Sequence, residues 1–458
     1  MKRRNLSARG VSPLVPTESV AASTDELDPR LALARALELA GECEVRDKVS
    51  TTRMRTITRR GVMWLGQTCN LRCYFCYFLD RIESKDHPEH PFMSLEKAQE
   101  ICKTLVERYG NNAIDIQGGE PTIWRPIYDL VRYCREIGLA PTLITNGLVL
   151  DDVENCRKFQ QAGIRDFLVS VHGLGEVHDR VVQVPGAHVR QMKALRNLRE
   201  LGIPFRFNCV LSKPVTTQLP EIAELAVRTG ARVVNFLAFN PFEDQAKGGR
   251  RSANNVPMYS EMRDKLTEAL DVLDKAGVEA NVRYYPLCMA EERHRKSMYN
   301  FQQLPYDHHE WDYASWSWTG MQPQRMRDGE LSGGLPLTNQ RLVKLLKEPA
   351  KKVMRLPVLG DVAVRAHREV GHLLDRVRDK DTVYRENGRK RAEVDCGYQY
   401  GTPCKQCSVR DICDGFHGDY AALFGTDEAE TIHYGHRVDD PLYYISRQDK
   451  IVEPDGLD

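Results

Sequence analysis

The sequence predicts an α/β fold in which parallel strands alternate with helices. From Val62 onward, a short apolar stretch, a loop, a stretch with apolar residues three and four positions apart, and a glycine recur six times. Such an alternation implies parallel strands joined by right-handed crossovers. A partial barrel and a doubly wound open sheet both satisfy this pattern. In either fold, ligands bind at the carboxyl ends of the strands.

The expected elements follow in order along the chain. Strands are expected at residues 62–66, 113–117, 142–145, 167–171, 205–210 and 233–239, with a seventh candidate at 280–285. Helices are expected to end near Gly110, Gly138, Gly163, Gly202, Gly230 and Gly277, because glycine readily takes the left-handed conformation that follows a helix. A short amphipathic helix is expected at 29–39. Apolar faces carry Cys102, Cys134, Cys156 and Cys209, which we expect in the core.

Length, charge and cysteine content limit the classes of function. The chain has 458 residues, enough for about two domains of ordinary size. Its net charge of +1 favours neither a nucleic-acid partner nor an acidic membrane surface. We find no apolar run of the length that a secretory signal or a bilayer-spanning helix needs. Thirteen cysteines in such a chain favour metal ligation in a reducing, cytoplasmic compartment.

The stretch CNLRCYFC places Cys69, Cys73 and Cys76 directly after the first expected strand. Three thiolates at this spacing can hold three irons of a [4Fe–4S] cluster and leave the fourth iron open to a small chelating molecule. A zinc site or three structural cysteines are the alternatives. Zinc sites usually pair one Cys-x2-Cys with a second pair, and none follows within fifty residues.

The same stretch, with Phe75 just before its last cysteine, resembles the signature of the radical S-adenosylmethionine superfamily. The resemblance implies a partial (β/α)6 barrel and S-adenosylmethionine bound through its amine and carboxylate to the open iron. It also implies a reaction in which one electron cleaves the C5'–S bond, and the resulting 5'-deoxyadenosyl radical takes hydrogen from a substrate. An external one-electron donor such as flavodoxin or ferredoxin is expected.

The run GGEPT after the second expected strand resembles a second motif of that superfamily, whose backbone and acidic residue hold the cofactor's ammonium group. Gly118 and Gly119 allow a close approach of the backbone, and the Glu120 carboxylate can accept charge-assisted hydrogen bonds. A turn with a surface glutamate would look the same in isolation, but the position of the run, forty-two residues beyond Cys76 and one strand later, favours the cofactor motif. Further cofactor contacts are expected at later strand ends, at Asn146, Ser170, Asn208 and the backbone near Ala238, although such residues also serve to cap loops. His172 is either a substrate ligand or a hydrogen-bonded loop residue.

A second cysteine group lies near the end of the chain, at Cys396, Cys404, Cys407 and Cys413. Its Cys-x2-Cys-x5-Cys run resembles the SPASM and twitch extensions, which carry auxiliary [4Fe–4S] clusters. His417 stands where the SPASM pattern continues with a cysteine, which puts two auxiliary clusters in doubt. We expect one cluster, with Cys396 as the fourth ligand and Cys288 as the second choice. A structural zinc ribbon is the alternative.

An aromatic segment runs from Tyr299 to Trp318 and includes Asp307, His308, His309 and Glu310. Stacking aromatics together with titratable groups suit a polar substrate that needs general acid–base assistance, so these four residues are the catalytic candidates. Packing into an interdomain core would look the same in the sequence. Residues 345–393 are rich in charge and predict a solvated surface helix at 362–377.

We expect four regions and one principal function. The regions are an N-terminal arm at 1–59, the barrel at 60–286, a substrate cap at 287–395 and the auxiliary-cluster region at 396–458. The resemblance favours dehydration or dehydrogenation of an aminocyclitol, amino sugar or other polyol in natural-product or antibiotic biosynthesis. Modification of a ribosomal peptide is the rival reaction, and a non-catalytic iron–sulfur or zinc scaffold is the rival class.

Overall fold

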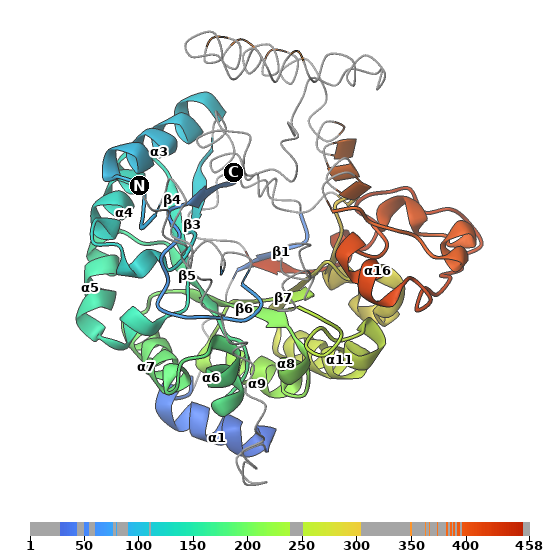
Figure 1. Ribbon diagram of the computed structural model, residues 1–458, viewed down its shortest axis with the longest axis horizontal. Coiled ribbons are helices and arrows are strands. Elements are labelled where there is room, and N and C mark those ends of the chain that lie inside the picture. Colours follow the sequence, from blue (N-terminus) through green and yellow to red (C-terminus); the bar gives the residue numbers. More distant parts are fainter. Residues whose placement is uncertain are drawn as a thin grey trace, which may run out of the picture.

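The computed structural model describes residues 28–43, 50–54, 60–76, 79, 90–109, 111–238, 251–303 and 396–451, with isolated positions between 349 and 393. Its main sheet is curved, with helices along its outer side (Figure 1). The eight strands follow one another in chain order, and every neighbouring pair is parallel. They are β2 Arg60–Trp64, β3 Ala113–Gln117, β4 Ala140–Thr145, β5 Asp166–Ser170, β6 Phe205–Leu211, β7 Val233–Ala238, β8 Glu279–Arg283 and β9 Met298–Tyr299. Since β2 and β9 form the two edges, the sheet is a partial barrel.

The helices alternate with these strands. They are α1 Pro29–Ala40, α3 Leu95–Tyr109, α4 Ile127–Glu136, α5 Val153–Ala162, α6 Glu176–Val182, α7 Ala187–Glu200, α8 Lys213–Thr216, α9 Leu219–Thr229, α11 Tyr259–Ala276 and α16 Gly418–Phe424. Short 3-10 turns are η2 Pro121–Ile123, η3 Leu148–Asp151, η4 Leu287–Met289, η5 Glu292–Ser297, η9 Thr402–Gln406, η10 Arg410–Ile412 and η11 Ile445–Arg447. Within the described part of the chain, no helix has the length and apolarity needed to cross a membrane.

The alternating pattern of the sequence corresponds closely to the observed elements. The seven expected strands are β2 to β8, each within two residues of its predicted bounds, and the expected N-terminal helix is α1. Left-handed glycines follow α5, α9 and α11 at Gly163, Gly230 and Gly277, as predicted. Gly110 lies outside the described residues. The edge strand β9 was not predicted, because two residues are too few to show a period.

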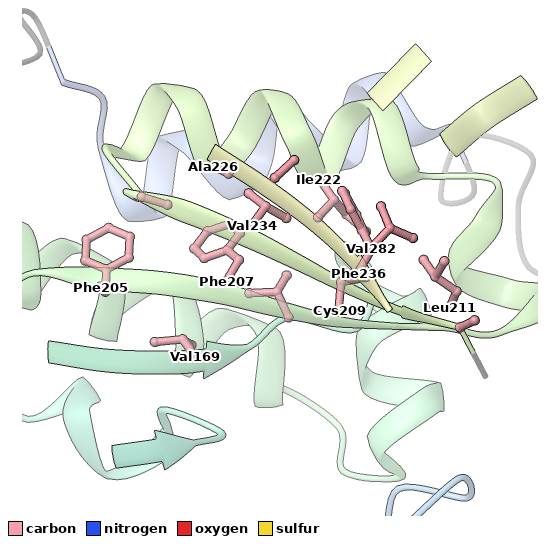
Figure 2. Packing of buried hydrophobic residues seen from close by; sticks show 14 of the residues in the cluster. Val169, Phe205, Phe207, Cys209, Leu211, Ile222, Ala226, Val234, Phe236 and Val282 are labelled. Carbon is pink, nitrogen blue, oxygen red and sulfur yellow. The ribbon is translucent and has the colours of Figure 1, made fainter. Parts of the chain in front are cut away.

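The hydrophobic core lies between the sheet and the outer helices. Figure 2 shows Phe207, Cys209 and Phe236 from β6 and β7 packed with Ile222 and Ala226 of α9. All five side chains are fully buried, and each large one contributes roughly 1.5–3 kcal/mol by leaving water. The four cysteines expected in the core are fully buried there too. Because side chains alternate along a strand, this outer core leaves the other face of each strand for the barrel interior.

The barrel interior carries charged groups at the amino-terminal ends of its strands. The Arg206 guanidinium of β6 pairs with the Asp166 carboxylate of β5 at 2.6 Å, and Thr142 Oγ1 donates to the same carboxylate. Burial alone would raise the pKa of Asp166, but Arg206, with Arg165 beside it, holds that pKa well below its usual value. Paired charges thus occupy the barrel interior at the amino-terminal ends of the strands. The carboxyl ends of the strands remain for a ligand site.

A two-stranded ribbon joins segments from opposite ends of the described chain. Strand β1 (Thr51–Thr52) pairs antiparallel with β10 (Lys450–Ile451). Lys450 Nζ donates to Glu279 Oε1 at 3.0 Å and to Asn281 Oδ1 at 2.7 Å, both in β8. The ribbon is therefore anchored to the barrel near its second edge.

Candidate active site

The three cysteines of the first motif lie in one loop at the carboxyl end of β2. All three are half-buried. Burial, followed by the Glu120 carboxylate, raises the pKa of Cys69 to about 12, and the Cys76 thiol adds to this rise. Burial and then the thiols of Cys76 and Cys69 raise the pKa of Cys73. The thiols are thus close enough to oppose one another's ionisation, which a bound cationic cluster would reverse, so the donor set fits an iron–sulfur cluster.

The glycine motif packs directly beneath this loop. Gly118 and Gly119 have φ of 98° and 58°. A Cβ on Gly119 would collide with the carbonyl oxygen of Thr68, and Glu120 N donates to that oxygen at 2.8 Å. The two glycines therefore allow the backbone after β3 to approach the segment that leads into Cys69. Any larger residue would separate the two loops.

The Glu120 carboxylate accepts hydrogen bonds from four protein donors. Oε1 accepts from Thr122 N at 3.1 Å, Thr122 Oγ1 at 2.6 Å and Thr145 Oγ1 at 2.7 Å, and Oε2 accepts from Asn146 N at 2.7 Å. Only 1% of the residue is exposed. These contacts tie the ends of β3 and β4 together. The role of Glu120 as a direct ligand of the cofactor ammonium stays a prediction.

Asn146 extends this connection to the cysteine loop. Its Nδ2 donates to Asn70 Oδ1 at 2.7 Å, and its Oδ1 accepts from Leu148 N at 3.0 Å. The side chain expected to contact the cofactor is thus engaged with the protein at both ends. Asn70, which the sequence analysis missed, immediately follows Cys69. The sequence feature that could have pointed to Asn70 is its polar amide side chain directly after the first cysteine of the motif.

A row of polar side chains crosses the inner face of the barrel. In strand register, Ser170 lies beside Asn208, Asn208 beside Asn235, and Asn235 beside Asn281. All four are half-buried, and Asn281 Nδ2 donates to Asn235 Oδ1 at 3.2 Å. We had singled out Ser170 and Asn208 for the cofactor but missed the two asparagines that continue the row. Ala238, at the end of β7, is buried.

His172 packs beside the cysteine loop as a neutral, hydrogen-bonded residue. Its ring meets that of Phe75 edge to face, with centroids 4.8 Å apart. Its Nδ1 accepts from Val210 N at 3.3 Å, while its own backbone N donates to His178 Nδ1 at 3.2 Å. Burial lowers the pKa of His172 to about 3. Of the two alternatives from the sequence, these contacts support the loop residue.

The second cysteine group gathers around a separate pocket. This pocket is lined by the thiols of Cys288, Cys404, Cys407 and Cys413, with Tyr400, Arg410, Phe416 and Glu430 among their neighbours. Cys396, our first choice as fourth ligand, is not among the lining residues; its carbonyl accepts from Gly418 N at 3.0 Å. His417 caps α16, where its Nδ1 accepts from Asp419 N at 3.1 Å. The structure therefore brings Cys288, the second choice, to the other three.

The catalytic candidates Asp307, His308, His309 and Glu310 lie outside the described residues. Of the aromatic segment, Tyr299 and Phe301 are described: the Arg283 guanidinium lies 4.7 Å from the Tyr299 ring centroid, and Phe301 lies near Tyr284. Among the described residues, no three His, Cys, Asp or Glu side chains converge as ligands of a single metal ion. In a cubane cluster, each thiolate binds a different iron.

Comparison with known proteins assigns the barrel to a family. A parallel partial barrel with three clustered thiols at its carboxyl end defines a class of iron–sulfur-binding domain. Residues 65–226 match the Radical SAM superfamily model. These residues are a radical SAM domain, and the cofactors of that superfamily are S-adenosylmethionine and a [4Fe–4S] cluster.

Several curated proteins are similar to the same region. An AdoMet-dependent heme synthase of Oleidesulfovibrio alaskensis is 29% identical over 38% of this chain and 43% of its own length. A PqqA peptide cyclase of Rhodopseudomonas palustris is 29% identical over 36% of this chain and 40% of its own. The chain thus spans less than half the length of these relatives. SuiB of Streptococcus suis bound to S-adenosylmethionine has a TM-score of 0.41 at 17% identity, covering 50% of each chain.

Proposed function

We propose that this protein is a radical SAM enzyme that abstracts hydrogen from a small polar substrate. The observation that carries the proposal is the loop of three mutually interacting, half-buried thiols, with the glycine motif packed beneath it. Cys69, Cys73 and Cys76 would hold the cluster, which would supply the single electron, received from an external donor, that reductive cleavage of S-adenosylmethionine requires.

The chain's own residues have separable tasks in this proposal. Cys69, Cys73 and Cys76 ligate three irons, and their spacing leaves the fourth iron for the cofactor. Glu120 and Asn146 act as positioning residues, because their hydrogen bonds fix the glycine motif and the cysteine loop relative to each other. A group held within a fraction of an ångström by such contacts is prepared for reaction before substrate binds.

The polar row on the inner face supports a substrate with several hydroxyl or amide groups. Ser170, Asn208 and Asn235 offer donors and acceptors without charge. An aminocyclitol, amino sugar or other polyol, undergoing dehydration or dehydrogenation, is therefore our first candidate. Asp307, His308, His309 and Glu310 would supply proton transfer, and their substitution should lower product formation more than formation of 5'-deoxyadenosine.

A peptide is the second candidate substrate. Amide side chains in a row can also bind peptide backbone, and one relative of the barrel is a PqqA peptide cyclase. A panel of deuterated polyols and peptides separates the two, because the true substrate transfers deuterium to 5'-deoxyadenosine. Transfer from peptides alone would exclude the polyol candidate.

The enzymatic proposal itself is tested by anaerobic reconstitution. We expect iron and sulfide in the protein, and 5'-deoxyadenosine on addition of S-adenosylmethionine with dithionite or reduced flavodoxin. Stoichiometric zinc without iron, or an iron-loaded protein that never cleaves the cofactor, would refute the proposal and favour a scaffold.

A further inference from the structure

We propose that Cys288 is the fourth thiolate of a second [4Fe–4S] cluster, closing a ligand set with Cys404, Cys407 and Cys413. This inference rests on the proposed function only in that the chain is loaded with iron–sulfur clusters. It assigns a ligand from the barrel side of the molecule and excludes Cys396, the cysteine nearest in sequence.

Position is the first argument. Cys288 lies in η4, a few residues after β8, whereas the other three lie in and after η9, more than a hundred residues later. All four line one pocket, and each is between 5% and 8% exposed. Cys396 is more exposed than any of them, and it lies beside α16 through the hydrogen bond from Gly418 N. Four thiols around one pocket supply the all-cysteine ligand set that a [4Fe–4S] cluster needs.

Proximity of the sulfurs is the second argument. The Cys288 thiol lies near enough to the thiols of Cys404, Cys407 and Cys413 to interact with each of them. The four sulfurs are therefore neighbours around one pocket.

A backbone donor directed at one of the sulfurs is the third argument. Gly415 N donates to Cys413 Sγ at 3.4 Å. N–H groups of this kind stabilise thiolates and tune bound clusters. The pocket thus supplies the ligands and a supporting hydrogen bond.

Two consequences follow from four protein thiolates. First, no iron of this cluster is open, so neither cofactor nor substrate ligates it, and its role is electron transfer or anchoring. Second, the cluster joins the barrel to the C-terminal region, because Cys288 comes before the intervening segment and the other three ligands come after it. Chelation should therefore loosen the contact between these two parts.

The test isolates the second site by removing the first. In the full chain carrying Cys69→Ala, Cys73→Ala and Cys76→Ala, all remaining cluster signal reports on the second pocket. We expect about four irons and four sulfides per chain, unchanged when Cys396→Ala is added as the matched control. Adding Cys288→Ala should remove the iron or convert it to a three-iron cluster, seen by electron paramagnetic resonance and Mössbauer spectroscopy.

A conservative variant distinguishes the loss of a cluster ligand from misfolding of the protein. Cys288→Ser offers an oxygen ligand of nearly the same size, so we expect it to retain a cluster with a shifted resonance spectrum and native circular dichroism. Loss of iron with Cys396→Ala but not with Cys288→Ala would overturn the assignment, as would stoichiometric zinc in the triple variant. A second cluster that persists in a protein unable to cleave S-adenosylmethionine would refute the proposed function and leave this inference standing.

Discussion

The two cysteine regions of this protein contrast in how their ligands are assembled. The first is a single loop, with Cys69, Cys73 and Cys76 within eight residues and all half-buried. The second draws Cys288 from the barrel and its partners from the C-terminal region, and all four are nearly inaccessible. A local, partly open site suits a cluster that must meet a small molecule. An enclosed site built from distant segments suits a cluster that only exchanges electrons or holds the structure together.

The contrast between the two cysteine regions predicts that a substitution in the first loop has the largest effect on cluster content and cofactor cleavage. Cys73→Ala should remove one of two clusters and all cleavage of S-adenosylmethionine, because the site has only three thiolates. Iron analysis and liquid chromatography of 5'-deoxyadenosine measure both. Cys396→Ala is the matched control and should keep both clusters. Cleavage above one-tenth of wild type in Cys73→Ala would remove the distinction between the two regions.

Cys407→Ala should act differently. The first cluster and cleavage of the cofactor without substrate should persist, while product formation should fall at least tenfold, because the second site does not bind the cofactor. The ratio of product to 5'-deoxyadenosine reports this uncoupling. An unchanged ratio at normal turnover would show that the second pocket is only structural.

Glu120→Gln sharpens the account of the first region. The new amide would present its NH2 group either to Asn146 N or to the donors around Thr122, leaving a buried donor unsatisfied at a cost of about 1–3 kcal/mol. We expect lower thermal stability together with weaker binding of S-adenosylmethionine, measured by calorimetry. Thr216→Val, which removes a hydroxyl bond to Lys213 O away from the site, serves as control. Normal stability with lost binding would show that Glu120 is a direct cofactor ligand.

The prediction with the smallest expected effect on catalysis is an acid sensitivity of the stability of the first region. Burial lowers the pKa of His172 to about 3 and of His188 to about 4, and it also lowers that of His178. The unfolded chain has histidine pKa values of about 6.5. At a pH between the pKa of the folded state and that of the unfolded state, the unfolded chain therefore binds protons that the folded chain does not. The free energy of unfolding should therefore fall on acidification, by about 1.4 kcal/mol per pH unit for each histidine.

Urea unfolding between pH 7 and pH 5 measures this dependence. His188→Leu should reduce the slope of stability against pH by the share of one histidine. If the free energies of unfolding of the variant and the wild type depended on pH in the same way, the pKa of His188 would not be lowered by folding.

The sequence predicted what is encoded locally. Strands β2 to β8, the glycines after the helices and the first cysteine loop each lie within one continuous stretch, where apolar period or spacing is visible. The edge strand β9 and the position of Cys288 depend on which segments meet in space, so no local pattern shows them. Glu120 illustrates a third limit, because its residue type is compatible with binding a ligand, and the sequence does not show the four protein donors that its carboxylate engages.

The ribbon of β1 and β10 has a consequence for the order in which this protein matures. Nearly the whole described chain lies between Thr51 and Ile451, so this contact has a high sequence separation and forms late. During synthesis the strand–helix units around the first cysteine loop are complete long before Cys404 emerges. The first site can thus receive iron on the nascent chain, whereas the second must wait for nearly the full length.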